Sequence, residues 1–201
     1  INSKLTSNLS FNLTNGLGYY EQYKENGDQD YITRKWLDNQ FIVGNYSLNY
    51  QSNKLNMNFG SSYSEYDGDH FGKVIWAQNT AGIQVDDRFY DGNGIKKDFS
   101  NYVKTTYQLN SKLSLYGDIQ LRNVNYKTSG STSDIANFLI NKKYNFFNPK
   151  GGFNYLFNNY NNVYFSFARS NREPTRSDYE SNPNIRSEQL NDFEFGWSLT
   201  K

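Results

Sequence analysis

His70 is the only histidine in the chain, and together with Asp67 and Asp69 it could bind a metal. One imidazole and two carboxylates are ligands that transition metals accept. The alternative is a turn in an external loop, because the pair Asp67-Gly68 is typical of turns. Since the 201 residues contain no cysteine, nucleophilic catalysis by a Ser-His-Asp triad would need His70 itself. We therefore expect no catalytic residue, no metal site and no cofactor.

Residues 171–179 form a second charged segment, with the sequence Asn-Arg-Glu-Pro-Thr-Arg-Ser-Asp-Tyr. Arg172 and Arg176 could each bind an anionic group through two parallel hydrogen bonds. The alternative is that these arginines pair with Glu173 and Asp178 and so order the loop. Both readings place the segment at the end of a strand.

The elements that position these groups are strands, because apolar residues recur at every second position. In residues 5–13, for example, Leu5, Leu9, Phe11 and Leu13 alternate with polar residues. A period of two places the two sets of side chains on opposite faces of a strand. No segment shows a sustained helical period, so the sequence predicts an all-β fold. The predicted strands are residues 4–23, 38–50, 54–64, 99–109, 113–126, 147–157, 163–171 and 190–200.

The connections between these strands alternate between short and long. The short ones are 51–54, 110–112 and 158–162, and the long ones are 24–37, 65–98, 127–146 and 172–189. All long loops therefore emerge at one end of the sheet, as in antiparallel up-and-down transmembrane barrels. Several strands exceed the roughly 9–11 residues that cross a bilayer, so we expect them to project on the long-loop side. Residues 91–94, Asp-Gly-Asn-Gly, predict a tight turn within the longest loop.

The short connections also predict the register, because loop length fixes which residues face each other. In all three hairpins the simplest register keeps one face apolar. The predicted pairs are Tyr107–Leu115 and Val103–Ile119, Leu48–Met57 and Tyr46–Phe59, and Tyr155–Phe165 and Phe153–Phe167.

Composition is consistent with a membrane barrel. The net charge of +1 gives no reason to expect a nucleic-acid partner. Mean hydropathy is −0.88, and a transmembrane helix would need roughly 20 apolar residues in a row. Barrel strands need apolar residues on the lipid face only, and the aromatic content of 18 % suits the aromatic girdles of such barrels. A soluble β-sandwich is the alternative, but the polar face here is rich in Asn, Ser, Thr, Gln and Gly rather than Lys and Glu.

Four segments in residues 148–197 resemble motifs of TonB-dependent outer-membrane receptors. Residues 148–155 are similar to the family's Asn-Pro-basic-x-Gly-x-x-Tyr strand, and residues 164–175 resemble its Tyr-x-Ser-aromatic strand with the following Arg-x-Pro-Thr. Residues 182–188 resemble Asn-Pro-x-Leu-Lys-Pro-Glu, although Ser187 replaces the proline, and residues 194–197 match Glu-x-Gly-aromatic. Each motif is weak alone, but their order and spacing together are fairly specific.

The resemblance implies part of an active transporter in the outer membrane of a Gram-negative bacterium, and the Asn, Tyr and Lys content suggests a Bacteroidetes-like source. Residues 1–201 would form about eight strands of a single barrel of about 22 strands. The plug domain and the C-terminal barrel strands would lie outside this chain. The implied partners are outer-membrane lipid, the plug domain, the TonB complex and a small ligand such as an iron chelate.

The resemblance also implies roles for particular residues. Ligand contacts would come from two loops, with the candidates Trp76, Arg88, Phe89, Tyr90, Arg172, Glu173, Arg176 and Tyr179. The wall of the lumen would include Lys104, Asp118, Gln120, Arg122, Lys150, Asn154, Asp192 and Glu194. The alternative for each wall residue is an ion pair or hydrogen bond that braces the lumen, and Lys104–Asp118 is the leading pair of this kind.

Two other membrane proteins compete with a transporter segment. A complete eight-stranded barrel with a structural or adhesive role would pair its first strand with its eighth. An outer-membrane hydrolase would hydrogen-bond a serine or aspartate to His70.

Overall fold

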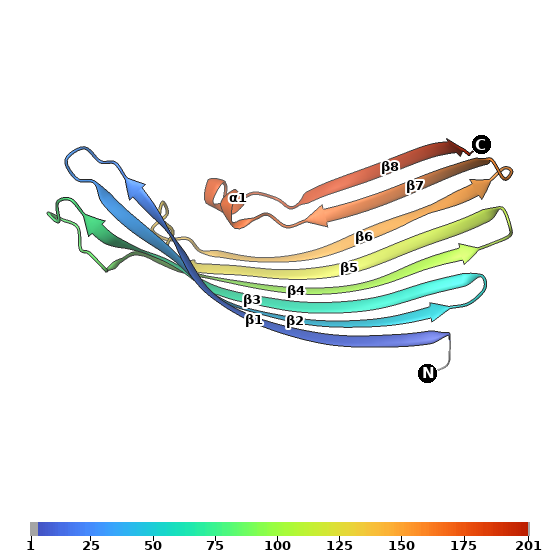
Figure 1. The fold of residues 1–201 in the computed structure, drawn as a ribbon, viewed down its shortest axis with the longest axis horizontal. Helices are drawn as coiled ribbons and strands as arrows, with labels where there is room; N and C mark the ends of the chain where they lie inside the picture. Colours follow the sequence, from blue (N-terminus) through green and yellow to red (C-terminus); the bar gives the residue numbers. More distant parts are fainter. Residues whose placement is uncertain (1–3, 201) are drawn as a thin grey trace.

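The computed structural model describes residues 4–200 as one antiparallel sheet whose eight strands follow the order of the chain. Figure 1 shows the short turns, the start of the first strand and the end of the last strand at one end of the sheet, and the long connections at the other. The elements are β1 (Leu5–Lys24), β2 (Tyr31–Gln51), β3 (Leu55–Ala77), β4 (Arg88–Gln108), β5 (Leu113–Gly130), β6 (Ile140–Leu156), β7 (Asn161–Arg172), α1 (Arg176–Ser181) and β8 (Glu188–Leu199). The all-β, up-and-down prediction is therefore confirmed. α1, the one described helix, is too short to span a membrane.

The sheet does not close on itself within the described residues: β1 pairs with β2 and β8 with β7, and no pairing joins β1 to β8. The alternative of a complete eight-stranded barrel required that pairing. The described strands also form one sheet rather than two packed layers, which a β-sandwich would need.

The two faces of the sheet differ sharply in polarity, and we call them the outer face and the inner face. The outer face is apolar near the short turns and remains exposed, with Phe11 at 78 % and Phe195 at 75 %. This apolar band ends at one residue on every strand: Leu13, Ile42, Tyr63, Phe99, Leu121, Phe147, Phe167 and Phe193. The next outer residues are Asn15, Gln40, Glu65, Lys97, Asn123, Asn145, Arg169 and Asn191. On β5 the band covers Leu113 to Leu121, a length that matches the roughly 9–11 residues of a strand that crosses a bilayer.

Two of the three predicted registers are wrong by two residues, while the β4–β5 register is confirmed. Leu48 faces Phe59 rather than Met57, and Tyr155 faces Val163 rather than Phe165. The turns are tighter than assumed, since Ser52 N–H donates to the Leu55 carbonyl at 2.8 Å. Because side chains alternate with a period of two, a two-residue error leaves every residue on its predicted face.

The predicted loop 65–98 is also wrong, because β3 runs to Ala77 and β4 begins at Arg88. Beyond the apolar band the two faces of these strands no longer differ in polarity: Glu65 and Asp67 lie on the outer face, and residues 74–77 are apolar without alternation. The period-two signal therefore disappears although the pairing continues. His70 therefore lies within β3 rather than in a loop, and Asp91 to Gly94 belong to β4 rather than to a turn. His70 is on the inner face, whereas both Asp67 and Asp69 accept hydrogen bonds from Asn93 on the outer face.

Glycine on the inner face makes room for tyrosine rings from neighbouring strands. A Cβ added at Gly60 would overlap the ring of Tyr102, and one added at Gly196 would overlap the ring of Tyr164. The rings therefore lie flat against the wall, where only a residue without a side chain permits so close an approach.

Candidate functional site

A cleft of about 970 Å³ opens on the inner face at the long-loop end. The ends of β1 to β4 line it together with the connections 25–30, 78–87 and 131–139. Three cationic residues (Lys24, Lys35, Arg88) and two acidic ones (Asp87, Asp134) occur in its lining. The side-chain Oε1 atom of Gln22, another lining residue, is buried and accepts no hydrogen bond within the described chain. The remaining lining residues are Asn26, Gln29, Tyr31, Thr33, Val74, Gly82, Ile83, Gln84, Phe89 and Ser133.

A register shift beside this cleft brings two consecutive aromatic residues to the inner face. Gly72 pairs with Tyr90 and Lys73 pairs with Arg88, so Phe89 has no partner on β3. Such a bulge re-aims a side chain, and both aromatic rings lie next to Gly72. Phe89 and Tyr90 meet edge to face at 5.1 Å; Tyr90 is buried and Phe89 is exposed.

The other two candidates from this region, Arg88 and Trp76, are directed differently. The Arg88 guanidinium lies 3.7 Å from the ring centroid of Phe71 and pairs with Asp91 at 2.6 Å, and both partners are outer-face residues. Trp76 is paired in register with Ile32 on the outer face and is exposed. Among the four candidates Trp76, Arg88, Phe89 and Tyr90, only Phe89 offers an exposed aromatic ring to the cleft on the inner face.

Residues 173–187 fold back onto the inner face, and we call this segment the strap. It contains α1, which begins with a capping box between Thr175 and Asp178. Tyr179 is 1 % exposed, stacks on Tyr126 of β5 at 5.7 Å, and shares a hydrogen bond with the hydroxyl of Tyr144 on β6. Phe138, Ile140 and Tyr179 form the core of an apolar cluster, against which Tyr126, Ile135 and Ile185 pack.

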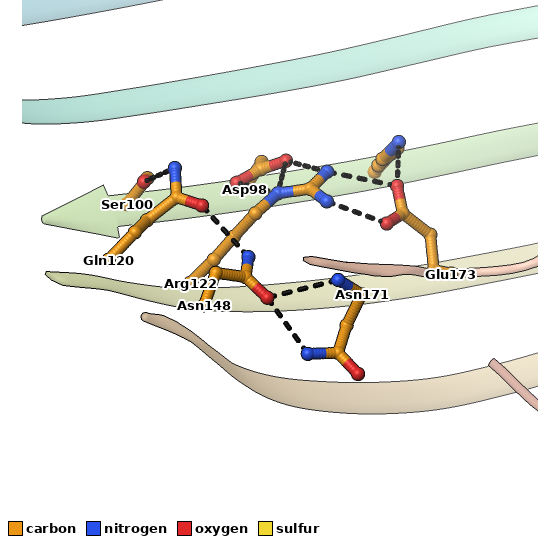
Figure 2. A network of polar contacts seen from close by, with 8 residues as sticks. Asp98, Ser100, Gln120, Arg122, Asn148, Asn171 and Glu173 are labelled. Atoms are coloured by element: carbon orange, nitrogen blue, oxygen red, sulfur yellow. Dashed lines mark hydrogen bonds and ion pairs between the residues drawn. The ribbon is translucent and has the colours of Figure 1, made fainter. Parts of the chain in front are cut away.

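A buried ion network fixes the start of the strap (Figure 2). The side chain of Glu173 is 8 % exposed, pairs with Arg122 of β5 at 2.9 Å, and also contacts the ammonium group of Lys96 on β4. Arg122 binds Asp98 of β4 through two nitrogens, at 2.9 and 2.6 Å. Burial opposes the ionisation of Glu173, but hydrogen bonds from Lys96, from its own backbone N–H and from Arg122 outweigh it, and the pKa of Glu173 is lowered.

A chain of amide hydrogen bonds continues this network toward the end of β7. Gln120 donates to Ser100 Oγ at 3.0 Å, and Asn148 donates to Gln120 at 2.9 Å. The backbone N–H of Asn171 then donates to the Asn148 side chain at 3.0 Å. Figure 2 shows that these residues from β4, β5, β6 and β7 converge on the inner face beside Glu173.

The predicted pairing of Arg172 and Arg176 with Glu173 and Asp178 is wrong. Arg172 is exposed and pairs with Glu188 at 2.8 Å, and Arg176 pairs with Glu180 at 3.1 Å. Glu173 instead reaches the wall, and Asp178 is used by the helix cap. A sequence search for partners within the loop could not find strand residues far away in the chain.

All eight wall candidates lie on the inner face. In the observed registers the even-numbered residues of β4 to β8 pair with one another and share that face. The candidates are Lys104, Asp118, Gln120, Arg122, Lys150, Asn154, Asp192 and Glu194. Lys104 and Asp118 face each other, 3.9 Å apart. Lys96 and Asp98 were not expected on the wall, because they fell in the predicted loop 65–98. Lys24 and Lys35 fell in the predicted loop 24–37, which is wrong at both ends because β1 reaches Lys24 and β2 begins at Tyr31. Gln22 was missed although the alternation of the predicted strand 4–23 places it on the inner face.

A polar inner face, an apolar outer band of bilayer length and long connections at one end define the class of this molecule, a wall segment of a transmembrane β-barrel. A family model described as TonB dependent receptor-like, beta-barrel, matches residues 2–201. The chain belongs to this family, whose members are outer-membrane proteins of Gram-negative bacteria. The resemblance seen in residues 148–197 is thereby confirmed.

Solved structures share the same fold at low sequence identity. The siderophore receptor PiuA from Acinetobacter baumannii superimposes with a TM-score of 0.71 at 14 % identity, over 98 % of this chain and 35 % of that one. The unliganded ferric citrate transporter FecA gives 0.66 at 13 %, over 98 % and 30 %. The ferric yersiniabactin uptake receptor FyuA from Yersinia pestis gives 0.60 at 11 %, over 100 % and 32 %. The chain thus spans about a third of each of these proteins. No curated protein matches its sequence.

Proposed function

We propose that this chain is part of the barrel of an active outer-membrane importer that takes up a scarce nutrient such as a ferric siderophore. The ligand binds first at the long-loop end, which faces the cell exterior. A plug domain fills the lumen, and the TonB complex, driven by the proton gradient of the inner membrane, displaces it. The chain itself supplies a polar wall and ligand contacts rather than catalysis.

The cleft at the long-loop end is the observation that carries this proposal. Its volume of about 970 Å³ falls within the range of pockets that hold small ligands. Lys24 and Lys35 offer positive charge to an anionic chelate, the exposed ring of Phe89 offers a stacking surface, and Gln22 offers an unused acceptor. The cleft lies beyond the apolar band, so a ligand reaches it without entering lipid. PiuA, FecA and FyuA are receptors or transporters for a siderophore, ferric citrate and ferric yersiniabactin, and this favours an iron chelate as the ligand.

Uptake of radiolabelled ferric chelates under iron limitation, with and without the gene, tests the function. We expect deletion to abolish uptake of one chelate, and normal growth and uptake on every iron source would reject the siderophore proposal. Binding to the purified full-length receptor then tests the cleft. Removing the charge in Lys35→Gln should weaken chelate binding about tenfold, the scale of one charge-assisted hydrogen bond.

Lys143→Gln is the matched control, because Lys143 is an exposed lysine on the outer face of β6. We expect wild-type affinity from this variant. Equal affinities of the two variants would remove the cleft from the proposal.

A further inference from the structure

Residues 131–139 connect β5 to β6, and the two sides of this β5–β6 connection differ in polarity. Its tip is polar, because Ser133 and Asp134 are exposed and line the cleft. Its other side is apolar: Phe138 is 4 % exposed, and the half-buried Ile135 packs against the apolar cluster that contains Tyr179. The connection therefore lies between the cleft and the strap.

The strap supplies the surface on which the apolar side of the connection rests. Phe138 packs with Tyr179 of α1 in the core of the apolar cluster, and Ile135 and Ile185 pack against that core from the two segments. The guanidinium of Arg176 lies 5.3 Å from the ring centroid of Phe138, a cation–π contact. The cleft is lined by no strap residue in the described part of the chain. The β5–β6 connection is thus the link between the strap and the cleft.

Hydrogen bonds fix the two ends of the connection to the sheet but not its middle. The backbone N–H of Ser131 donates to Asp91 of β4, and that of Phe138 donates to the last residue of β5, each at 2.8 Å. Within the described residues, the hydrogen bonds between these ends are internal to the connection. The hydroxyl of Thr132, for example, accepts from two backbone N–H groups of the turn that follows it, at 3.2 and 3.0 Å. The place of the tip relative to the sheet therefore depends on how the apolar side chains pack.

We infer that the strap positions this wall of the cleft, with Tyr179 and Phe138 as the positioning residues. The inference rests on the proposed function, in which the cleft binds the ligand. While the strap is docked, the tip holds the Ser133 hydroxyl and the Asp134 carboxylate at the cleft. When the strap leaves the wall, the connection loses its apolar support and the tip becomes mobile. A ligand that contacts the tip therefore binds more tightly to the docked form, and by thermodynamic reciprocity it stabilises docking of the strap.

A distance between two spin labels tests this positioning in the full-length receptor without any chelate. The chain has no native cysteine, so nitroxides on Ser133→Cys and Lys35→Cys report the place of the tip relative to β2, and both positions line the cleft. We expect one narrow distance distribution in this labelled background. Tyr179→Ala removes the ring against which Phe138 packs, so the distribution should widen at least about twofold.

Two further variants separate positioning from a general loss of structure. Tyr179→Phe keeps the ring and loses only the hydroxyl, so it should restore the narrow distribution. Leu139→Ala is the matched control, because Leu139 belongs to the same connection but is 70 % exposed. A broad distribution before any change at Tyr179, an unchanged one in Tyr179→Ala, or equal widening in Leu139→Ala would overturn the inference.

Glu173→Gln tests the same link from a distance. The ion pairs of Glu173 are with Arg122 and Lys96 on the wall, and Glu173 does not line the cleft. Because this variant loosens the start of the strap, hydrogen exchange at the backbone N–H of Ile135 should rise several-fold together with that of the strap. A strap that opens while exchange at Ile135 stays unchanged would show that the strap does not position the tip. Neither measurement requires transport, so a receptor that fails the uptake assay can still give a clear result here.

Discussion

Replacing Glu173 by glutamine removes one charge from the buried network and leaves its shape nearly unchanged. Removing one partner of a fully buried ion pair costs about 3–5 kcal/mol. The free-energy cost of Glu173→Gln should be smaller, because Lys96 is 38 % exposed and can reach water, and because Arg122 stays paired with Asp98. We therefore expect docking of the strap to weaken by about 1–3 kcal/mol, which corresponds to a roughly 5- to 150-fold increase in its opening.

Hydrogen exchange of the strap amides measures this opening directly. The N–H of Asn182 donates to the Asp178 carbonyl at 2.8 Å and that of Tyr179 donates to Thr175 at 3.2 Å, so both should lose protection in Glu173→Gln. The strands that form the sheet should not change.

The control is Glu180→Gln, which removes a carboxylate of α1 that pairs with Arg176 at 3.1 Å at the surface. Exposed pairs of this kind contribute roughly 0.3–0.5 kcal/mol, so exchange should rise no more than about twofold. If the two variants open the strap equally, the buried network does not anchor it.

Three further outcomes follow from the same structure. Because the pKa of Glu173 is lowered in the folded protein, its ionised form stabilises strap docking fully above the pKa of an unfolded glutamate. Hydrogen-exchange protection of the wild-type strap should therefore fall as the pH drops through the lowered folded-state pKa. The Glu173→Gln variant should show no such step. Burial and then Arg176 lower the pKa of His70, so its neutral form stabilises the fold above about pH 6.5; thermal melting in His70→Gln should lose the part of the acid sensitivity that begins there. Tyr179→Phe should cost about 1 kcal/mol and Tyr179→Ala about 3–5 kcal/mol of strap docking, and equal exchange rates in both would contradict the packing.

The sequence was most informative where water and lipid impose opposite demands on the two faces. Leu113, Leu115, Ile119 and Leu121 alternate with polar residues because one side of β5 is apolar and the other is polar, so strands and faces followed from the period. Beyond the band that contrast vanishes. The stretch from Glu65 to Ala77 therefore looked like a loop although it pairs along nearly its whole length.

The site was harder to predict because its partners are brought together by register. Glu173 meets Arg122 across 51 positions and Asn171 meets Asn148 across 23. Such contacts depend on exact strand pairing, and two of three hairpins were misjudged by two residues. The residue types were nevertheless informative: Arg122 and Gln120 were expected on the wall, and they are members of the observed network.

The tyrosine rings that lie over glycines determine how far the inner face of the wall projects at these positions. If the side chain of Tyr102 or Tyr164 pointed straight away from the sheet, its ring would reach toward the centre of the lumen. Because each ring lies flat, it adds only its own thickness to the inner face. Gly60 and Gly196 on the adjacent strands leave the space in which these rings lie flat, because glycine has no side chain. A single methyl group at either glycine would overlap the ring and force it to move. If the chain acts as the proposed importer wall, residues that need not touch the ligand therefore determine how far these rings reach into the lumen.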